Sequence, residues 1–311
     1  MKSKMASYLV LFLGVAALST SAIFVRLANA PSSITAFYRL FITALILLPF
    51  AFFKEENRKE LLSLSKKQWG FGILSGLFLS MHYVLWFESL RFTSVASSTV
   101  IVTLQPLFAI VGGFFVFKER FSRGAIIGFM ITINAILIHG WGDFQVGGQA
   151  LLGDVLALVA AGMITVYFFI GQHLRKNLSV IPYSFLGYVC SSVFLGIYAI
   201  SQQVSFTSYP VQTWQAFLGL ACIATIFGQM SFNWLLKWLS TSVISMSILG
   251  ETIGTCILAY LVLDEGISLQ QGVGIAVILT GLALFLIQKN KSEGRVDSPS
   301  AVPLEIENEV L

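Results

Sequence analysis

One acidic residue, Glu251, lies near the middle of an apolar stretch of the chain, residues 239–267. An uncompensated carboxylate in such a stretch is costly unless it is paired, protonated or faces a water-filled cavity. Burial favours the neutral form of a carboxylate, so Glu251 could load and release a proton. The alternative is an acid that only ties two helices together.

A basic residue, Arg39, lies about six residues into another apolar stretch, roughly 9 Å along a helix from its start. Its guanidinium could clamp a carboxylate or phosphate of a substrate, or act as the counter-ion of Glu251. A position this shallow also allows the side chain to reach the aqueous interface. Both interpretations stay open at the level of sequence.

Gln105 and Pro106 occupy the centre of a third apolar stretch. A proline removes one backbone hydrogen bond, frees a carbonyl and bends the helix, and such breaks are tolerated where a helix lines a cavity. The pair therefore indicates a binding site at the break, while the alternative is a kink that serves packing alone.

Polar aromatic residues gather at His82, followed by Tyr83 and by Trp86 one helical turn on. They could form a cavity wall that stacks a planar substrate, or they could be a packed histidine with lipid-facing neighbours. Further polar positions are expected to bond neighbouring helices rather than a substrate. These are Asn134, Tyr167, Gln229 and Asn233.

The elements that position these residues are predicted to be membrane-spanning helices. The chain of 311 residues is 56% hydrophobic and only 11% charged, whereas soluble domains are about a quarter charged. Runs of about 20 apolar residues, each long enough to cross a hydrocarbon core, recur ten times. The predicted spans are about 7–28, 33–53, 69–89, 94–117, 123–141, 151–171, 182–202, 213–236, 241–263 and 268–288.

The distribution of Lys and Arg orients these spans. With a cytoplasmic N-terminus, sixteen of the 19 basic residues fall inside, Arg26 and Arg91 fall outside, and Arg39 lies within a span. Such an excess marks the cytoplasmic side. We therefore expect both termini to be cytoplasmic, in a multi-pass protein of a bacterial cytoplasmic (inner) membrane.

The chain contains an internal repeat. Sliding it by 146 residues lays residues 93–122 over 239–268, so that Gln105 falls on Glu251. Five spans per half is an odd number, so the second half enters the membrane in the opposite orientation. The sequence predicts an all-α protein of ten transmembrane helices in two inverted five-helix repeats. The repeats are residues 1–146 and 147–288, followed by a disordered cytoplasmic tail at 289–311.

Inverted repeats are typical of secondary transporters, because two similar halves can rock around one shared site. Enzyme motifs such as HExxH, GxSxG and the Gly-rich phosphate loop are absent from the sequence. We expect no enzymatic activity, cofactor, metal site or nucleic-acid binding. The expected partners are a small-molecule metabolite and the lipid bilayer, and the sequence gives no indication of the oligomeric state.

The two repeats resemble the EamA family of the drug/metabolite transporter superfamily. The resemblance rests on the Leu104-Gln105-Pro106 centre, on the Phe117-Lys118-Glu119-Arg120 exit, on their counterparts at 239–268 and on Tyr38-Arg39-Leu40-Phe41. It covers residues 7–288. It implies ten helices around a central cavity, and export of amino acids or similar small metabolites by alternating access.

This sequence departs from the family's acid-proline pair, because Gln105 lacks the acid and Glu251 is followed by threonine. If the acid couples protons, only the second half can do so, and both proton coupling and facilitated diffusion stay open. The expected site consists of Glu251, Arg39, Gln105, His82, Tyr83 and Trp86. The alternatives are an exchanger of phosphorylated or nucleotide-linked sugars, and a membrane scaffold or sensor that transports nothing.

Overall fold

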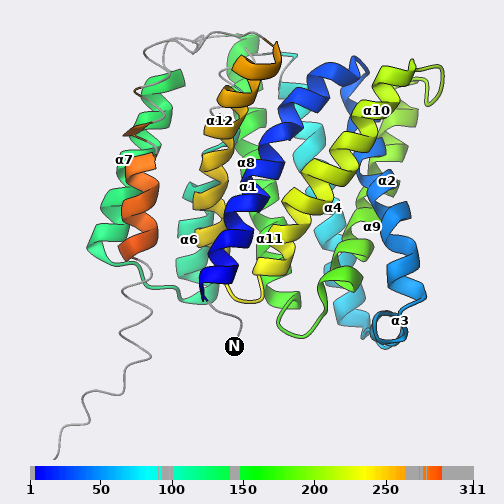
Figure 1. Cartoon of the computed structure of the whole chain (residues 1–311), viewed down its shortest axis with the longest axis horizontal. Coiled ribbons are helices and arrows are strands. Elements are labelled where there is room, and N and C mark those ends of the chain that lie inside the picture. The colour runs from blue at the N-terminus through cyan, green and yellow to red at the C-terminus, as the bar shows by residue number, and fades with distance from the viewer. Residues whose placement is uncertain are drawn as a thin grey trace, which may run out of the picture.

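The computed structural model describes residues 4–89, 91–92, 98, 101–140, 148–263, 273, 276–277 and 279–288. In these ranges every regular element is a helix. Most of the helices run side by side between two faces of the molecule, with the N-terminus at one of them (Figure 1). The tail predicted to be disordered, residues 289–311, lies outside the described residues.

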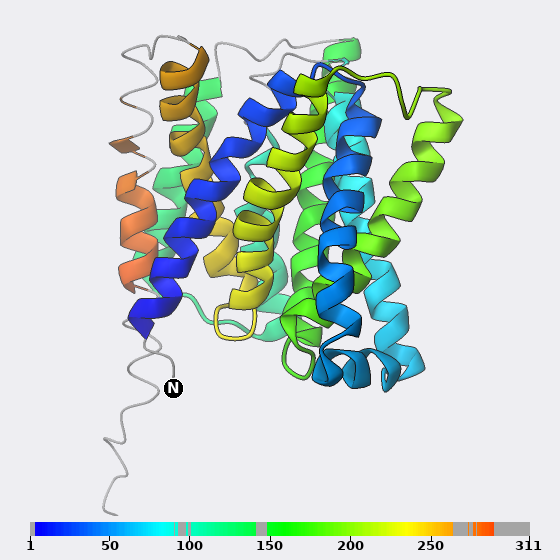
Figure 2. The ribbon, with the colours of Figure 1, turned by 45° about the vertical axis from the view of Figure 1, so that its right-hand side comes forward.

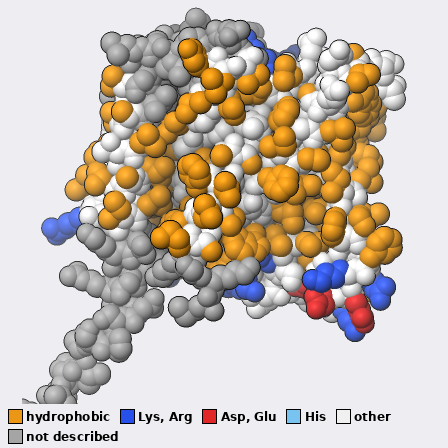
Figure 3. All heavy atoms as spheres, in the orientation of Figure 1, with side chains coloured by type: hydrophobic (Ala, Val, Ile, Leu, Met, Phe, Trp, Pro, Cys, Tyr) orange, Lys and Arg blue, Asp and Glu red, His pale blue; other side chains and the backbone are white. Residues whose placement is uncertain are grey.

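Seven helical segments are long and apolar enough to cross a membrane. They are α1 (Lys4–Ala28), α2 (Ser32–Phe52), α4 (Lys66–Ser89), α8 (Gln149–Leu174), α9 (Val180–Ser201), the joined α10 (Val211–Gly219), η2 (Leu220–Gln229) and α11 (Met230–Leu235), and α12 (Thr241–Leu263). Shorter apolar helices are α6 (Gln105–Phe117) and Leu279–Gln288, and α7 is Arg123–Gly140. Hydrophobic side chains cover the view between the two ends (Figure 3). The chain is a polytopic membrane protein, and ten crossings stay a prediction.

Proline and left-handed residues set several helix boundaries. Pro31 and Pro210 directly precede α2 and α10 in extended conformations, with φ −52° and −66°. A proline fixes φ and has no N–H to leave unsatisfied at a helix start. At the other end of α6, Lys118 adopts a left-handed conformation (φ 56°), and the N–H of Glu119 donates to the carbonyl oxygen of Gly113 at 3.0 Å.

The break predicted at Gln105-Pro106 is present. Residues 101–102 are helical, residues 103–104 form a turn, and α6 begins at Gln105 with Pro106 in its first turn. The missing N–H of proline costs nothing there, because the first N–H groups of a helix have no intrahelical partner. Because of this break, Gln105 is the first residue of a helix.

A short helix, α3 (Glu55–Leu62), lies in the connection between the second and third predicted spans. Its acidic residues are in the first turn, and Lys59 pairs with Glu55 at 2.6 Å, an arrangement that suits the helix dipole. Asn57 is buried and donates to the carbonyl oxygen of Phe50 at 2.8 Å. The helix therefore caps the end of α2 from outside the predicted spans.

The eighth predicted span is interrupted by a π-helix, η2, which the sequence did not indicate. Its wider turns bring Thr225 Oγ1 to 2.8 Å from the carbonyl oxygen of Leu220, five residues earlier. π-Helical turns are rare and are frequent at functional sites. Here the π-helix carries Thr225, which contacts the candidate site described below.

α8, from the middle of the chain, packs against helices of both halves. α4 packs along α8 and α9, α1 packs along α12 and the α10–η2–α11 segment, and α6 packs against α8 and α12. Figures 1 and 2 both show α1 beside the α10–η2–α11 segment. The tyrosines Tyr167, Tyr183 and Tyr188 are fully buried among these helices.

Candidate functional site

Arg39 is buried in the interior rather than extended to a surface, with only 4% of its side chain exposed. Its Nε donates to Thr225 Oγ1 at 2.9 Å, and Nη1 donates to Ser21 Oγ at 2.9 Å. The guanidinium carbon lies 5.2 Å from the centre of the Tyr83 ring, within cation–π range. Arg39 therefore joins α1, α2, α4 and η2 through one desolvated cation.

Glu251 lies on α12 and is partly buried. Its carboxylate interacts electrostatically with Arg39 and with Tyr83. No ion pair within 4.0 Å joins Glu251 to Arg39 in the described part of the chain. The two charges are thus near enough to attract each other without touching.

The aromatic group of α4 borders Arg39. The hydroxyl of Tyr83 donates to Oε1 of Gln229 at 3.2 Å. Nδ1 of His82 lies 3.0 Å from the carbonyl oxygen of Ala160. A carbonyl only accepts, so this contact requires the ring proton on Nδ1.

The indole N–H of Trp86 is buried and has no hydrogen-bond partner within the described ranges. The ring itself stacks on His82, with centroids 5.9 Å apart. Buried donors are nearly always satisfied in folded proteins, and an exception deserves a functional explanation. The indole N–H of Trp86 is therefore a free hydrogen-bond donor next to His82 on α4.

Gln105 is buried at the start of α6, and its Nε2 donates to Ser245 Oγ on α12 at 2.9 Å. The structure thus links Gln105 to the helix that carries Glu251. Arg39 and Tyr83 interact with each other and with both His82 and Glu251, whereas Gln105 is connected to this group through its neighbours on α12 and α8. Ser21 and Thr225, which hold Arg39, were not among the predicted site residues.

Two hydroxyl contacts recur with the 146-residue offset. Ser19 Oγ donates to the carbonyl oxygens of Val15 (2.9 Å) and Glu251 (3.2 Å). Thr165 Oγ1, 146 residues after Ser19, donates to the carbonyl oxygens of Ala161 (2.8 Å) and Gln105 (3.4 Å). Each acceptor pair is related by the same offset, so α1 meets α12 as α8 meets α6.

Tyr83 and Gln229, which bond to each other, are themselves 146 residues apart. Two equivalent positions can touch only where the two halves of a repeat meet. The contact between Arg39 and Tyr83 therefore lies next to the meeting point of the two halves.

Asn233, on α11, is the centre of a second buried polar network. Its Nδ2, which carries two N–H donors, lies within hydrogen-bonding distance of three hydroxyl oxygens, those of Tyr167 (2.7 Å), Ser184 (3.1 Å) and Tyr188 (3.2 Å). The sequence prediction that Asn233 and Tyr167 bond neighbouring helices is confirmed. These contacts tie α8, α9 and α11 together.

Replacing Asn233 with alanine is expected to lower the free energy of unfolding by about 1–2 kcal/mol, because interhelical hydrogen bonds in membranes contribute about 0.6 kcal/mol each. Thermal unfolding of the detergent-solubilised protein measures this change. Asn134→Ala is the matched control, since Asn134 is exposed and donates only to Met130 of its own helix. Equal unfolding temperatures for both variants would contradict the expectation.

A second buried guanidinium, Arg175, directly follows α8 and is 2% exposed. It donates through Nε to the carbonyl oxygen of Asn233 (2.8 Å), through Nη2 to that of Trp234 (3.4 Å) and through Nη1 to that of Leu178. Arg175 lies between the predicted spans 151–171 and 182–202. Its position after a helix gave no sign of burial, because the acceptors are backbone carbonyls that no side-chain pattern reveals.

Within the described ranges, no group of three or more His, Cys, Asp or Glu side chains could hold a metal ion. The candidate site therefore consists of one cation, one carboxylate, aromatic rings and neutral polar groups. Such a set can bind a small solute that carries charges of both signs.

Comparison with known proteins shows the family to which the chain is similar. The model of the EamA-like transporter family matches residues 5–140 and again residues 151–287. The uncharacterized transporter YyaM of Bacillus subtilis is 22% identical over 259 residues, covering 81% of this chain and 83% of that protein. An uncharacterized transporter of Haemophilus influenzae is 25% identical, covering 70% and 74%.

The fold is also found among solved structures. One crystal structure superimposes with a TM-score of 0.77 at 17% sequence identity, covering 94% of this chain and all of that chain. This likeness concerns the fold alone. From the two family-model matches, the chain belongs to the EamA-like transporter family of the drug/metabolite transporter superfamily.

Proposed function

We propose that this protein is a secondary transporter that exports amino acids or similar small organic metabolites across a bacterial cytoplasmic membrane. The observation that carries the proposal is a pair of opposite charges, the buried Arg39 and the partly buried Glu251, which interact without direct contact. A zwitterion between them would place its carboxylate on Arg39 and its amine on Glu251.

The free donors of the site support this arrangement. Arg39 uses Nε and Nη1 on Thr225 and Ser21, while its Nη2 has no hydrogen bond within the described ranges. A guanidinium with unused N–H bonds is a strong ligand for a carboxylate. The indole N–H of Trp86 supplies a further donor for a polar solute.

Alternating access by two inverted five-helix halves is part of the proposal. It is supported by the two matches of one family model and by the contacts that recur at an offset of 146 residues. α1 runs away from the face that holds the N-terminus, and α8, its counterpart, runs toward that face (Figure 1). We place both termini on the cytoplasmic side because most Lys and Arg residues gather there.

Exchange of phosphorylated sugars is the weaker alternative. Such solutes carry about two negative charges per phosphate and call for several cations in the site. Of the two arginines that the structure buries, Arg175 donates to three backbone carbonyls and has little left to offer a phosphate. Arg39 alone suits a monocarboxylate better.

Glu251→Gln is expected to uncouple transport from protons, because the amide cannot load or release one. Reconstituted vesicles with an imposed pH gradient would be tested with a radiolabelled amino-acid mixture, while an internal pH dye follows proton movement. For the wild type we expect the gradient to drive accumulation. For the variant we expect the same flux with and without the gradient.

Asp154→Asn is the matched control, since Asp154 is a carboxylate in the first two turns of α8 and outside the candidate site. Gradient-driven accumulation by Glu251→Gln at the wild-type level would refute the coupling role. Vesicles containing the wild type that move no labelled solute faster than empty vesicles would refute amino-acid transport itself.

A further inference from the structure

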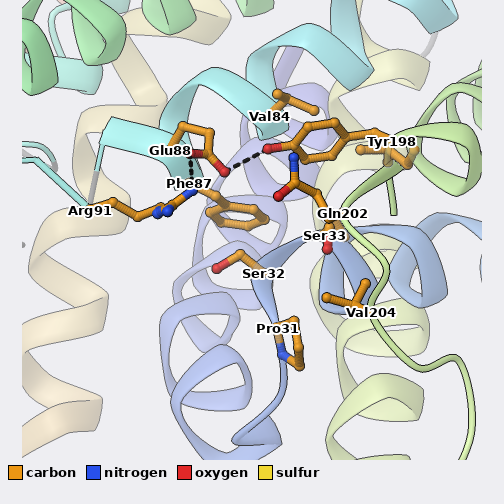
Figure 4. A pocket seen from close by; sticks show the side chains of 12 residues that line it. Pro31, Ser32, Ser33, Val84, Phe87, Glu88, Arg91, Tyr198, Gln202 and Val204 are labelled. Atoms are coloured by element: carbon orange, nitrogen blue, oxygen red, sulfur yellow. Dashed lines mark hydrogen bonds and ion pairs between the residues drawn. The ribbon is translucent and has the colours of Figure 1, made fainter. Parts of the chain in front are cut away.

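A pocket of about 170 Å³ opens at the face of the molecule opposite the N-terminus. It lies between the start of α2, the ends of α4 and α9, and the chain that follows α9 (Figure 4). Its buried floor contains Ser33, Phe87 and Leu195, and its exposed rim contains Arg91 and Gln202. None of the six predicted site residues lines it.

An unsatisfied serine faces this pocket. Ser33 is 9% exposed, and its hydroxyl makes no hydrogen bond within the described ranges. Buried hydroxyl groups almost always have a partner, in the protein or in a bound molecule. Ser33 therefore leaves its hydroxyl available at the pocket for a ligand that carries a hydrogen-bonding group.

The start of α2 adds backbone donors at the same place. The first intrahelical bond of α2 runs from the N–H of Thr35 to the carbonyl oxygen of Pro31 at 3.0 Å. Pro31 provides no side-chain cap, so the N–H groups of Ser32 and Ser33 precede the first bond of the helix. A helix start with free N–H groups favours an anion.

The one acidic residue of the pocket is already neutralised. Glu88 Oε2 accepts from Arg91 Nη1 at 2.8 Å, and Oε1 accepts from the hydroxyl of Tyr198 at 2.5 Å. Figure 4 shows both contacts at one side of the pocket. Because Glu88 is paired, the charge that a ligand meets in the pocket is the partial positive charge of the helix start at α2.

The other walls are apolar and set the size of the ligand. Ala36, Val84, Phe87, Leu195 and Val204 form them. An apolar cavity of about 150 Å³ holds a benzene molecule, which has six heavy atoms. A pocket of 170 Å³ therefore fits a ligand of about six to eight heavy atoms.

We propose that this pocket binds a small carboxylate with a short branched aliphatic tail. The carboxylate accepts from Ser33 and from the N–H groups at the start of α2, and the tail packs against Phe87 and Leu195. A free carboxylic acid and an amino acid share this chemistry. The assignment holds whether or not the protein transports anything through the Arg39–Glu251 site.

The test uses purified protein in lipid nanodiscs and three probes with the same aliphatic group, isobutyrate, valine and isobutylamine, in titration calorimetry. We expect both carboxylates to bind and the amine to show no binding. Binding of isobutylamine as tight as that of isobutyrate, or no binding of either carboxylate, would overturn the assignment.

Two variants locate the binding. Ser33→Ala is expected to weaken carboxylate affinity about tenfold, because a hydrogen bond to a charged group is lost. Ser33→Leu fills the pocket and is expected to abolish binding. Ser80→Ala is the matched control, a buried serine of α4 whose one hydrogen bond within the described ranges goes to Leu77 of its own helix.

Arg39→Gln separates this pocket from the central site, because it removes the guanidinium proposed to hold a carboxylate there and leaves every residue of the pocket lining in place. Carboxylate binding that survives Arg39→Gln and is lost in Ser33→Leu supports the pocket. Binding that is unchanged in both Ser33→Ala and Ser33→Leu places the carboxylate elsewhere and refutes the assignment.

Discussion

Replacing Arg39 with glutamine is expected to slow solute flux by about a hundredfold. The guanidinium has an unused Nη2 for a substrate carboxylate, and such a charged contact contributes about 1.5–3 kcal/mol, where about 1.4 kcal/mol is a factor of ten. The variant also leaves the carboxylate of Glu251 without its cation. Flux of labelled amino acids in reconstituted vesicles measures the effect.

Three further variants serve as controls that show whether the loss of flux is due to the guanidinium of Arg39. Arg58→Gln removes an exposed guanidinium and should transport normally. Arg39→Lys keeps the charge but cannot reach Thr225 and Ser21 together, so we expect an intermediate flux. In Arg39→Gln/Glu251→Gln the losses should not add, because interacting residues are coupled. Additive losses would show that the two charges act independently.

Gly76→Val is expected to lower the free energy of unfolding by about 3 kcal/mol, at the upper end of the cost of overpacking. A Cβ at Gly76 would lie 2.5 Å from Cys190 Cβ and 2.8 Å from the carbonyl oxygen of Gly187. Because that carbonyl belongs to the backbone of α9, the whole helix must move away from α4. The apparent unfolding temperature in detergent, together with the yield of monodisperse protein, measures the effect.

Gly70 offers the opposite case in the same helix. A Cβ there meets nothing within 4 Å. Gly70→Ala is expected to stabilise the protein by about 0.5–1 kcal/mol, because alanine loses less backbone entropy in a helix. If Gly76→Val unfolded at the same temperature as Gly70→Ala, the close approach of α4 and α9 would not be a determinant of stability.

Apolar length and proline predicted much of the fold. The spans expected at 33–53, 182–202 and 241–263 differ from α2, α9 and α12 by at most two residues at either end. The π-helix could not be foreseen, because it depends on where Thr225 finds its partners in three dimensions. The helix α3 was missed because it is polar and too short to give an apolar run.

Charge and offset predicted the candidate site better than residue type alone. Arg39 and Glu251 stood out as the charges within apolar runs, and the structure places them within electrostatic reach. Ser21 and Thr225 carry no such signal, since hydroxyl residues are common in membrane helices. Ser19 and Thr165 could have been found by the 146-residue offset, because both are hydroxyl residues at equivalent positions.

The same offset gives the Arg175 contacts a further meaning. Its acceptors Asn233, Leu178 and Trp234 lie 146 residues after Phe87, Ser32 and Glu88, which line the pocket on the opposite face. Arg175 thus donates to backbone carbonyls at the positions that correspond to three residues of the pocket, and the residue at its own corresponding position in the first half is Asn29.

The two faces are therefore held together by different polar contacts. If the halves exchange conformations, separating the end of α8 from α11 breaks the charge-assisted hydrogen bonds from Arg175 to the carbonyl oxygens of Asn233 and Trp234. On the pocket face, separating α4 from α9 breaks the hydrogen bond between Tyr198 and Glu88. A solute that reaches the site from the face of Arg175 would then first require the guanidinium to release the carbonyl oxygens of α11.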